Sequence, residues 1–216
     1  DDVNTCIEFK VPIIITSLRA LDPTLVQRIH AYGGIIFHDV INVRHAQKAI
    51  EAGVDGLVLV CAGAGGHAGT LSPFALVSEI KQFFDGAIAL SGSIANGESI
   101  LSAQALGADF AYIGTRFIAT KEANAEQDYK NMLVEHSAKD IVYSSLFTGV
   151  HGNYLKPSIS NAGLDPDNLQ QGDKNKMKFG SESSNKSKAW KDIWGAGQGL
   201  GSIADITDVA TIVERF

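Results

Sequence analysis

Short, continuous apolar runs alternate with amphipathic stretches between residue 12 and about residue 137. The apolar runs predict buried strands, and the amphipathic stretches predict helices that cover them. The predicted strands are 12–17, 35–40, 56–60, 87–91 and 110–114, and the predicted helices are 22–32, 43–52, 73–84, 96–106 and a longer stretch to about Ser137. This alternation is typical of a parallel sheet covered by helices.

Residues with known capping preferences support these helix boundaries. Asp22 and Pro23 are typical of a helix start, with Asp22 as the N-cap and Pro23 in the first turn. Gly33, Gly53 and Gly107 each follow a predicted helix, where glycine commonly ends the helix. The chain therefore contains five successive β-α units, each about 23–30 residues long.

The regular spacing of these units favours a (β/α)8 barrel of the TIM type over an open, doubly wound sheet. Five units cannot close an eight-stranded barrel. The chain begins at Asp1 without an initiator methionine and soon enters predicted structure. We therefore expect that the first three β/α units are absent from this chain and that an N-terminal barrel segment belongs to the complete fold. An open five-stranded sheet is the alternative.

The pattern changes after the fifth unit. Residues 1–144 are predicted to form the partial barrel, and residues 145–216 a C-terminal appendage. Within the appendage, residues 148–157 show no regular pattern, and residues 161–188 are polar and rich in Gly, Ser, Asn and Lys. Such a composition is typical of a flexible insertion. The pattern predicts a terminal amphipathic helix over residues 203–216.

Composition and charge exclude several classes of protein. The chain has 216 residues, of which 45% are hydrophobic and 19% charged, an ordinary globular balance. Its net charge of -6, without a basic stripe, argues against a nucleic-acid or anionic-membrane partner. No apolar stretch reaches the roughly 18 residues that a membrane span needs. Cys61 lies in an apolar run and is expected to be a buried thiol rather than half of a disulfide with Cys6, which fits a reducing, cytoplasmic location.

A glycine-rich loop at residues 62–69 follows the third predicted strand and contains the main catalytic candidate. In parallel α/β sheets, ligands bind at the carboxyl ends of the strands. Four glycines in this loop allow a ligand to approach the backbone closely, and His67 is the loop's single titratable side chain. The ordinary pKa of histidine, about 6.5, suits a general base. The alternative is a glycine-rich turn that carries a surface histidine.

Two further loops are candidates for binding a phosphate group. Gly92 and Ser93 follow the fourth predicted strand, and Gly114 and Thr115 follow the fifth. The loops after the last two strands of a (β/α) barrel commonly bind phosphate through backbone N–H groups and a helix N-terminus. If these strands are the last two, the four residues form a phosphate cradle. Glycine that serves only a turn is the alternative for each loop.

Other polar positions are weaker candidates. His38 and Asp39 end the second predicted strand and either reach the ligand or pack locally. Residues 149–154 form a polar, aromatic loop that could cover the site. The positions expected to lie on helix surfaces are His30, His45 and His136, and those that fit either a core or a lid are Trp190 and Trp194. No group of His, Cys, Asp and Glu has metal-ligand spacing, so we expect no metal site.

Four segments resemble, in order and spacing, the motif series of the nitronate monooxygenases, a family formerly known as 2-nitropropane dioxygenases. These segments are residues 64–69 (AGGHAG), 90–94 (LSGSI), 105–109 (ALGAD) and 113–117 (IGTRF). The resemblance runs from about Pro12 to Phe117. Later segments around Thr148-Gly149, Asn153-Tyr154-Leu155 and residues 194–199 (WGAGQG) are also similar to the family. Flavin-dependent enoyl-acyl-carrier-protein reductases share the series.

The resemblance implies an FMN-dependent (β/α)8 barrel that oxidises alkyl nitronates or nitroalkanes with molecular oxygen. It implies that His67 removes the proton next to the nitro group, that the resulting nitronate passes an electron to FMN, and that oxygen completes the oxidation. The implied contacts with FMN are Gly65 and Gly66 near the isoalloxazine ring, Gly92, Ser93, Gly114 and Thr115 around the phosphate, and Tyr112 and Ile113 nearby.

This chain departs from the family pattern at three places. Many members have Gln at the position of Val60, some have Lys at that of Asp39, and many have Gly-Gly where this chain has Gly92-Ser93. The first two departures concern contacts with the flavin ring. The phosphate cradle relies mainly on backbone donors and is less affected by a change of side chain.

Two other functions compete with the nitronate oxidase. One is an enoyl-acyl-carrier-protein reductase that uses NAD(P)H to reduce its flavin. The other is a non-catalytic barrel fragment that only binds a partner, and we expect residues 1–216 alone to aggregate or to need a complementing N-terminal segment. The expected partners are a small-molecule substrate and oxygen. The sequence leaves a homodimer open.

Overall fold

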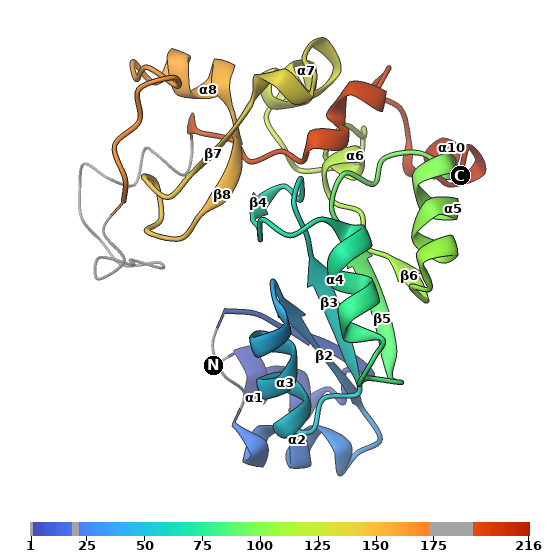
Figure 1. Ribbon diagram of the computed structural model, residues 1–216. Coiled ribbons are helices and arrows are strands. Elements are labelled where there is room, and N and C mark those ends of the chain that lie inside the picture. Colours follow the sequence, from blue (N-terminus) through green and yellow to red (C-terminus); the bar gives the residue numbers. More distant parts are fainter. Residues whose placement is uncertain (1, 19–21, 173–191) are drawn as a thin grey trace. The chain divides into compact units, whose positions relative to one another are not determined.

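The computed structural model describes residues 2–18, 22–172 and 192–216, which are coloured in Figure 1. The chain forms two compact units. The first contains Asp1–Cys61, Leu71–Ser91 and Ser102–Tyr112, and the second contains Ala62–Thr70, Gly92–Leu101 and Ile113–Phe216.

The first unit is built on a five-stranded parallel sheet. Its strands are β1 (Ile13–Thr16), β2 (Ile35–Val40), β3 (Gly56–Val60), β5 (Ala87–Ser91) and β6 (Phe110–Ala111), in the spatial order β1-β2-β3-β5-β6. The register pairs Ile13 with Ile35, Phe37 with Gly56, and Gly56 with Ala87. The prediction of a parallel sheet is confirmed.

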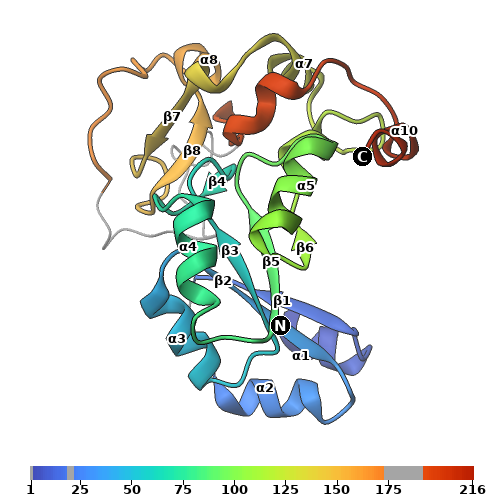
Figure 2. The ribbon, with the colours of Figure 1, turned by 45° about the vertical axis from the view of Figure 1, so that its right-hand side comes forward.

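The strand order follows the sequence order, which decides between two α/β architectures. In a doubly wound sheet the order reverses at a switch point, and helices cover both faces. Here every strand is added on the same side of its predecessor, and the right-handed connections place their helices on one face. The helices of this unit are α1 (Asp2–Glu8), α2 (Pro23–His30), α3 (Val43–Glu51), α4 (Pro73–Ile80) and the second half of α5 (Gly97–Leu106) (Figures 1 and 2). This arrangement differs from that of a doubly wound sheet.

The two faces of the sheet differ in burial. Sheet residues that face the helices, among them Ile36, Leu57 and Leu59, are fully buried, as are Leu76 and Ile80 of α4. On the other face, Ile13 is 53% exposed, Ile15 45% and Ile35 39%. Farther along this face the rings of Phe37 and Phe110 meet edge to face with centroids 6.3 Å apart. The β1 side of this face is therefore an apolar surface that nothing covers among the residues described.

The second unit contains a smaller antiparallel sheet in the order β4-β8-β7. Its strands are β4 (Gly66–His67), β7 (Ile141–Ser144) and β8 (Gly152–Leu155). The helices are α6 (Thr115–Ile118), α7 (Gln127–Glu135), α8 (Lys156–Asn161) and α10 (Val209–Glu214), with 3-10 turns η1 (Ala138–Asp140) and η3 (Gln198–Ser202). The core of this unit packs Leu133, Leu155 and Leu200 together with Ala119, Ala196 and Ile203.

The structure corrects the predicted elements in the C-terminal part of the chain. The expectation that residues 148–157 are irregular is wrong, because β8 lies there and is buried throughout. The long helix expected to reach about Ser137 is interrupted. The Thr120 hydroxyl donates to Phe117 O at 2.8 Å and accepts from Ala123 N at 3.1 Å, so it replaces helical hydrogen bonds. Lys121 N then donates to Thr207 O at 2.9 Å.

Three other differences are smaller. The fifth strand ends at Ala111 rather than at Gly114, because Gly114 is the N-cap of α6. The terminal helix is shorter than predicted, and the sequence pattern does not predict α1. Residues 173–191, which include Trp190 and most of the expected insertion at 161–188, lie outside the described residues. No helix of the described part is long and apolar enough to cross a membrane.

Candidate functional site

The loop Ala62–Thr70, which follows β3, is held by hydrogen bonds from distant parts of the second unit. Gly63 O accepts two main-chain bonds, one from Ser93 N at 3.3 Å and one from Gln198 N at 2.8 Å. The buried side chain of Asn153 donates from Nδ2 to Ala64 O at 2.7 Å. Three sequence segments therefore fix the first half of the loop.

The second half of the loop is fixed by the antiparallel sheet. His67 pairs with Gly152 in the β4–β8 ladder, and Ala68 N donates to His151 O at 3.3 Å. The Tyr143 hydroxyl donates to Ala68 O at 2.8 Å, and the Tyr143 ring stacks on that of His151 with centroids 5.0 Å apart. The main chain around His67 is thus an ordered platform rather than a free turn.

His67 itself is half-buried, and its ring is anchored. Its Nε2 lies 2.8 Å from the Thr148 hydroxyl oxygen. Burial lowers the pKa of His67 below its ordinary value of 6.5, because desolvation disfavours the imidazolium form. The side chain is therefore neutral at pH 7, the form that a general base needs.

Two glycines of the candidate site are present for different physical reasons. A Cβ on Gly65 would lie 2.8 Å from Gly197 N and 3.0 Å from the Thr115 hydroxyl oxygen, so close packing within the protein requires glycine there. A Cβ on Gly114 would meet nothing within 4 Å among the described residues, and its φ of -112° is open to any residue. Neither packing nor conformation within the described residues requires glycine at position 114.

Thr115 is the first residue of α6 and has a hydroxyl prepared to donate. Its oxygen accepts a hydrogen bond from Gly197 N at 2.9 Å, which leaves the hydroxyl proton for another acceptor. The first intrahelical donors of α6 are Phe117 N and Ile118 N, both bonded to Gly114 O. Among the described residues, the N–H groups of Thr115 and Arg116 have no intrahelical partner, as is usual in the first turn of a helix.

The other predicted phosphate loop contributes fewer donors than expected. Ser93 N is already bonded to Gly63 O, so it helps to hold the loop Ala62–Thr70 in place. Gly92 has a φ of 137°, and Ser93 has a φ of 57°, in the left-handed region that disfavours a side chain. Ile113 is partly buried just before Gly114, and Tyr112, in the first unit, is 45% exposed.

His38 and Asp39 do not act as a pair, because successive residues of a strand point to opposite faces. His38 is 7% exposed, and its Nδ1 lies 2.7 Å from the Thr16 hydroxyl oxygen. Asp39 shares the other face with Phe37. Burial raises the pKa of Asp39 more than nearby Ser17 lowers it, and Asp39 Oδ1 is buried without a hydrogen-bond partner among the described residues.

The remaining histidines have local roles. His30 pairs with Asp55 at 2.9 Å on the surface, and His136 Nδ1 lies 3.0 Å from Met132 O. His45, on exposed α3, donates its main-chain N–H to the N-cap Asn42. The described residues include no group of His, Cys, Asp or Glu that could hold a metal ion. Trp194 stacks on Tyr129 with centroids 4.9 Å apart and packs against the core of the second unit.

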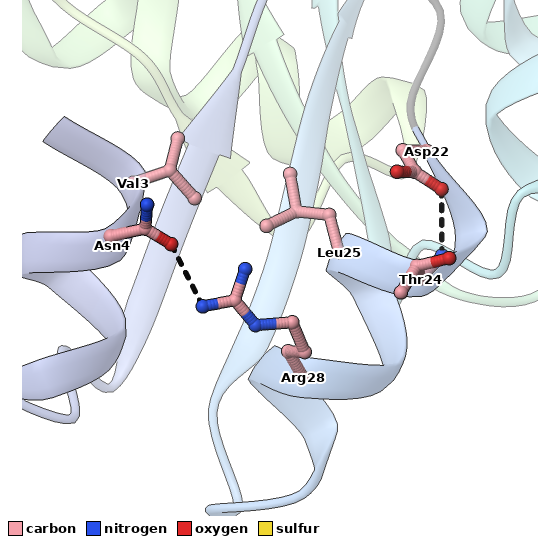
Figure 3. A pocket seen from close by; sticks show the side chains of 6 residues that line it. All are labelled: Val3, Asn4, Asp22, Thr24, Leu25 and Arg28. Atoms are coloured by element: carbon pink, nitrogen blue, oxygen red, sulfur yellow. Dashed lines mark hydrogen bonds between the residues drawn. The ribbon is translucent and has the colours of Figure 1, made fainter. Parts of the chain in front are cut away.

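A pocket between α1 and α2 in the first unit is accounted for by helix packing and capping (Figure 3). Its polar groups bond to one another. Arg28 donates to Asn4 Oδ1 at 2.8 Å, and Asp22 caps α2 by accepting from Thr24 N at 2.9 Å. We therefore do not take it as the functional site.

The sequence pattern missed most of the groups that fix the loop. It assigned no role to Tyr143. Thr148 and Gln198 entered only through the resemblance to a family, and Asn153 entered there and as part of the loop 149–154. The side-chain contacts of Tyr143, Thr148 and Asn153 join residues 75, 81 and 89 positions apart. A polar side chain of this kind carries no local signal of its partner.

A model of the family described as nitronate monooxygenase matches residues 2–216. The chain belongs to the nitronate monooxygenase family. This confirms the resemblance seen in the glycine-rich motifs. Nitronate monooxygenase of Paraburkholderia phytofirmans is 29% identical over 134 residues, which cover 58% of this chain and 37% of that protein. The chain thus spans well under half the length of that relative.

Two solved structures of similar fold match almost the whole chain. FabK from Thermotoga maritima has a TM-score of 0.76 and 23% identity, and the match covers 99% of this chain and 69% of FabK. Nitroalkane oxidase from Streptomyces ansochromogenes also has a TM-score of 0.76, with 20% identity, and the match covers 99% of this chain and 65% of that one. These similarities confirm the α/β fold with its parallel sheet.

Proposed function

We propose that this chain supplies the general base and the phosphate site of an FMN-dependent oxidoreductase that oxidises nitroalkanes and alkyl nitronates with molecular oxygen. The observation that carries the proposal is His67, a half-buried histidine with a lowered pKa on a platform clamped by Asn153, Tyr143 and Gln198. Membership of the nitronate monooxygenase family supports the substrate class.

His67 acts as the base toward a neutral nitroalkane. The proton on the carbon next to the nitro group is acidic, because the resulting negative charge moves to the nitro oxygens. The neutral imidazole takes this proton, the C–H electron pair moves toward the nitro group, and a nitronate forms. The platform holds the ring in one place, and such positioning is a large part of general-base catalysis. A preformed nitronate has already lost this proton and does not need the base.

The residues around α6 fit the phosphate of FMN. Gly114 leaves space for a ligand, the Thr115 hydroxyl has a proton to donate, and the N–H groups of Thr115 and Arg116 precede the first bonded donors of α6. Gly92 and the Ser93 side chain complete the cradle, and Gly65, Gly66, Tyr112 and Ile113 are the other residues we assign to the cofactor. Bound FMN supplies the electron transfer between substrate and oxygen.

We further propose that the parallel sheet is part of a closed (β/α)8 barrel. The sequential strand order and the helices on one face support this. The exposed side chains of Ile13, Ile15 and Ile35 would pack in the barrel interior beside strands that precede β1. Residues 1–216 produced alone should then self-associate in gel filtration. A monodisperse monomer with cooperative unfolding would contradict this part of the proposal.

A flavin spectrum and two substrates test the function. The intact protein, purified gently, should show flavin absorbance and consume oxygen with nitroethane or its nitronate. A colourless protein that binds no added FMN would contradict the proposal. Rapid bleaching of the flavin by NADPH, with turnover of a crotonyl thioester and none of the nitronate, would instead identify an enoyl reductase.

A further inference from the structure

Three polar atoms make hydrogen bonds of normal geometry with the Thr148 hydroxyl oxygen, and the Tyr154 hydroxyl lies nearby. His67 Nε2 lies at 2.8 Å, Val150 O at 2.9 Å and Val150 N at 3.1 Å. Thr148 is 7% exposed, so solvent contributes little to this arrangement. The proton positions follow from counting donors and acceptors.

A hydroxyl group has one proton and two acceptor lone pairs. Val150 O can only accept, so the Thr148 proton points to it. Val150 N can only donate, so it occupies one lone pair. The remaining lone pair of Thr148 faces His67 Nε2, which must therefore donate. In this assignment all three contacts are hydrogen bonds.

We propose that Thr148 is a positioning residue that holds neutral His67 in the tautomer with its proton on Nε2, so that Nδ1 carries the basic lone pair. The inference rests on the proposed function of His67 as the base. When His67 is protonated, the imidazolium keeps its Nε2–H bond to Thr148.

The backbone fixes both partners of this bond. Gly149 has a φ of 79° and its N–H donates to Ser145 O at 2.9 Å, which closes a turn that contains Thr148. His67 is held by its pairing with Gly152 in the β4–β8 ladder. The turn and the ladder therefore hold Thr148 and His67 in contact, because both residues lie on ordered main chain.

The opposite assignment has a recognisable cost. If the Thr148 proton pointed to His67 Nε2, the hydroxyl oxygen and Val150 O would lie 2.9 Å apart with no proton between them. Two such oxygens repel each other. The two assignments also predict opposite effects on the basicity of His67. A hydrogen-bond acceptor at Nε2 favours the charged imidazolium, whereas a donor favours the neutral ring.

Tyr154 provides a matched control. Its buried hydroxyl makes no hydrogen bond of normal geometry among the described residues, although the nearby Thr148 side chain lowers its pKa against the larger rise caused by burial. Tyr154→Phe removes a hydroxyl from the same neighbourhood and leaves the contact between Thr148 and His67 in place.

The test is ¹⁵N NMR of the intact protein labelled at histidine, with His67 assigned by its loss in His67→Asn. We expect a pyrrole-like Nε2 and a pyridine-like Nδ1 at neutral pH in the wild type, in Thr148→Ser and in Tyr154→Phe. In Thr148→Val this preference should be lost. The reverse tautomer in the wild type, or an unchanged tautomer in Thr148→Val, would overturn the proposal.

The same spectra give the direction of the pKa change. Thr148→Val should lower the titration midpoint of His67 by about 0.5–1 pH unit, the effect of losing one ordinary hydrogen bond to a charged group. Thr148→Ser should restore the midpoint, and a rise in Thr148→Val would overturn the proposal. These measurements need no substrate. A wild type with the expected tautomer but no nitroalkane oxidation would count against the proposed function alone.

Discussion

The main-chain nitrogen of Gly197 lies 2.9 Å from the hydroxyl oxygen of Thr115 and donates its hydrogen bond there. This bond joins the residue before η3 to the first residue of α6, 82 positions apart in the sequence. It orients the Thr115 hydroxyl, so that its proton is available to a ligand at the start of α6.

Replacing Thr115 should distinguish the contribution of its hydroxyl to FMN binding from that of the shape of its side chain. Thr115→Val keeps the size of the residue but removes both the acceptor for Gly197 and the donor for a phosphate. We expect FMN to bind about tenfold more weakly, which corresponds to about 1.4 kcal/mol. Thr115→Ser should bind FMN nearly as the wild type does. Fluorescence titration of the apoprotein with FMN measures both, and equal affinity of the two variants would contradict the assignment.

Alanine at Gly65 and alanine at Gly114 should affect different properties: the first should lower stability, and the second should weaken FMN binding. Gly65→Ala forces a Cβ against Gly197 N, so we expect a loss of about 1–3 kcal/mol in the free energy of unfolding. Gly114→Ala has room and an allowed φ, so its stability should match that of the wild type. Gly114→Ala should nevertheless weaken FMN binding. Urea unfolding and FMN titration distinguish the two, and unchanged FMN affinity in Gly114→Ala would remove the cofactor from this position.

His67→Asn should affect two substrates unequally. The amide keeps polar contacts in the loop but cannot take a proton, so oxidation of neutral nitroethane should slow by about a hundredfold or more. Oxidation of ethyl nitronate, which has already lost the proton, should change far less. Oxygen consumption measures both rates. Equal slowing would mean that His67 only positions the ligand.

The pH dependence of nitroethane oxidation should reflect the buried environment of His67. Because burial lowers its pKa, the neutral, active form persists below pH 6.5 and is lost only as the pH falls through the lowered pKa. The acidic limb of kcat/KM should therefore have its midpoint below 6.5. The same plot for the preformed nitronate, measured above the pH at which the nitronate itself protonates, should lack this limb. A midpoint above 6.5 would contradict a desolvated base.

Ser93 should be a site of backbone strain. It has a φ of 57°, where a non-glycine residue costs roughly 1 kcal/mol or more. Ser93→Gly should relieve this strain and raise the free energy of unfolding by up to about 1 kcal/mol. Ser93→Ala keeps the strain and removes the hydroxyl, so it separates the two contributions. Both variants lack the hydroxyl, so a Ser93→Gly protein that unfolds at lower urea than Ser93→Ala would contradict backbone strain at this position.

The parts of the fold that the sequence predicted share a local signal. The bounds of β2 and β3 match the prediction, because β3 is an apolar run after Asp55 and β2 is a mainly apolar segment after Gly34 whose only polar positions are His38 and Asp39. β8 has no such signal, since Gly152 and Asn153 are as typical of a loop as of a strand. Its strand state comes from pairing with β7 and β4, and tertiary contacts of this kind override weak local preference.

The candidate site likewise contains residues that a local sequence signal predicted and contacts that only the folded chain forms. Glycine spacing identified the loop around His67 and the turn at Gly114 from residues that are neighbours in the chain. The bonds from Thr148 and Gly197 join segments that only the folded chain brings together. Ser93 was predicted to donate to a phosphate, whereas its N–H is bonded to Gly63. One backbone group can serve only one such partner well.

The sequential strand order has a consequence for synthesis of the protein. Each strand of the five-stranded sheet pairs with one made before it, so the sheet is complete in sequence once residue 112 has left the ribosome. The bonds that fix the loop around His67 come from residues up to Gln198. The ribosome thus makes every strand of this sheet well before the last residue that orders the loop around His67.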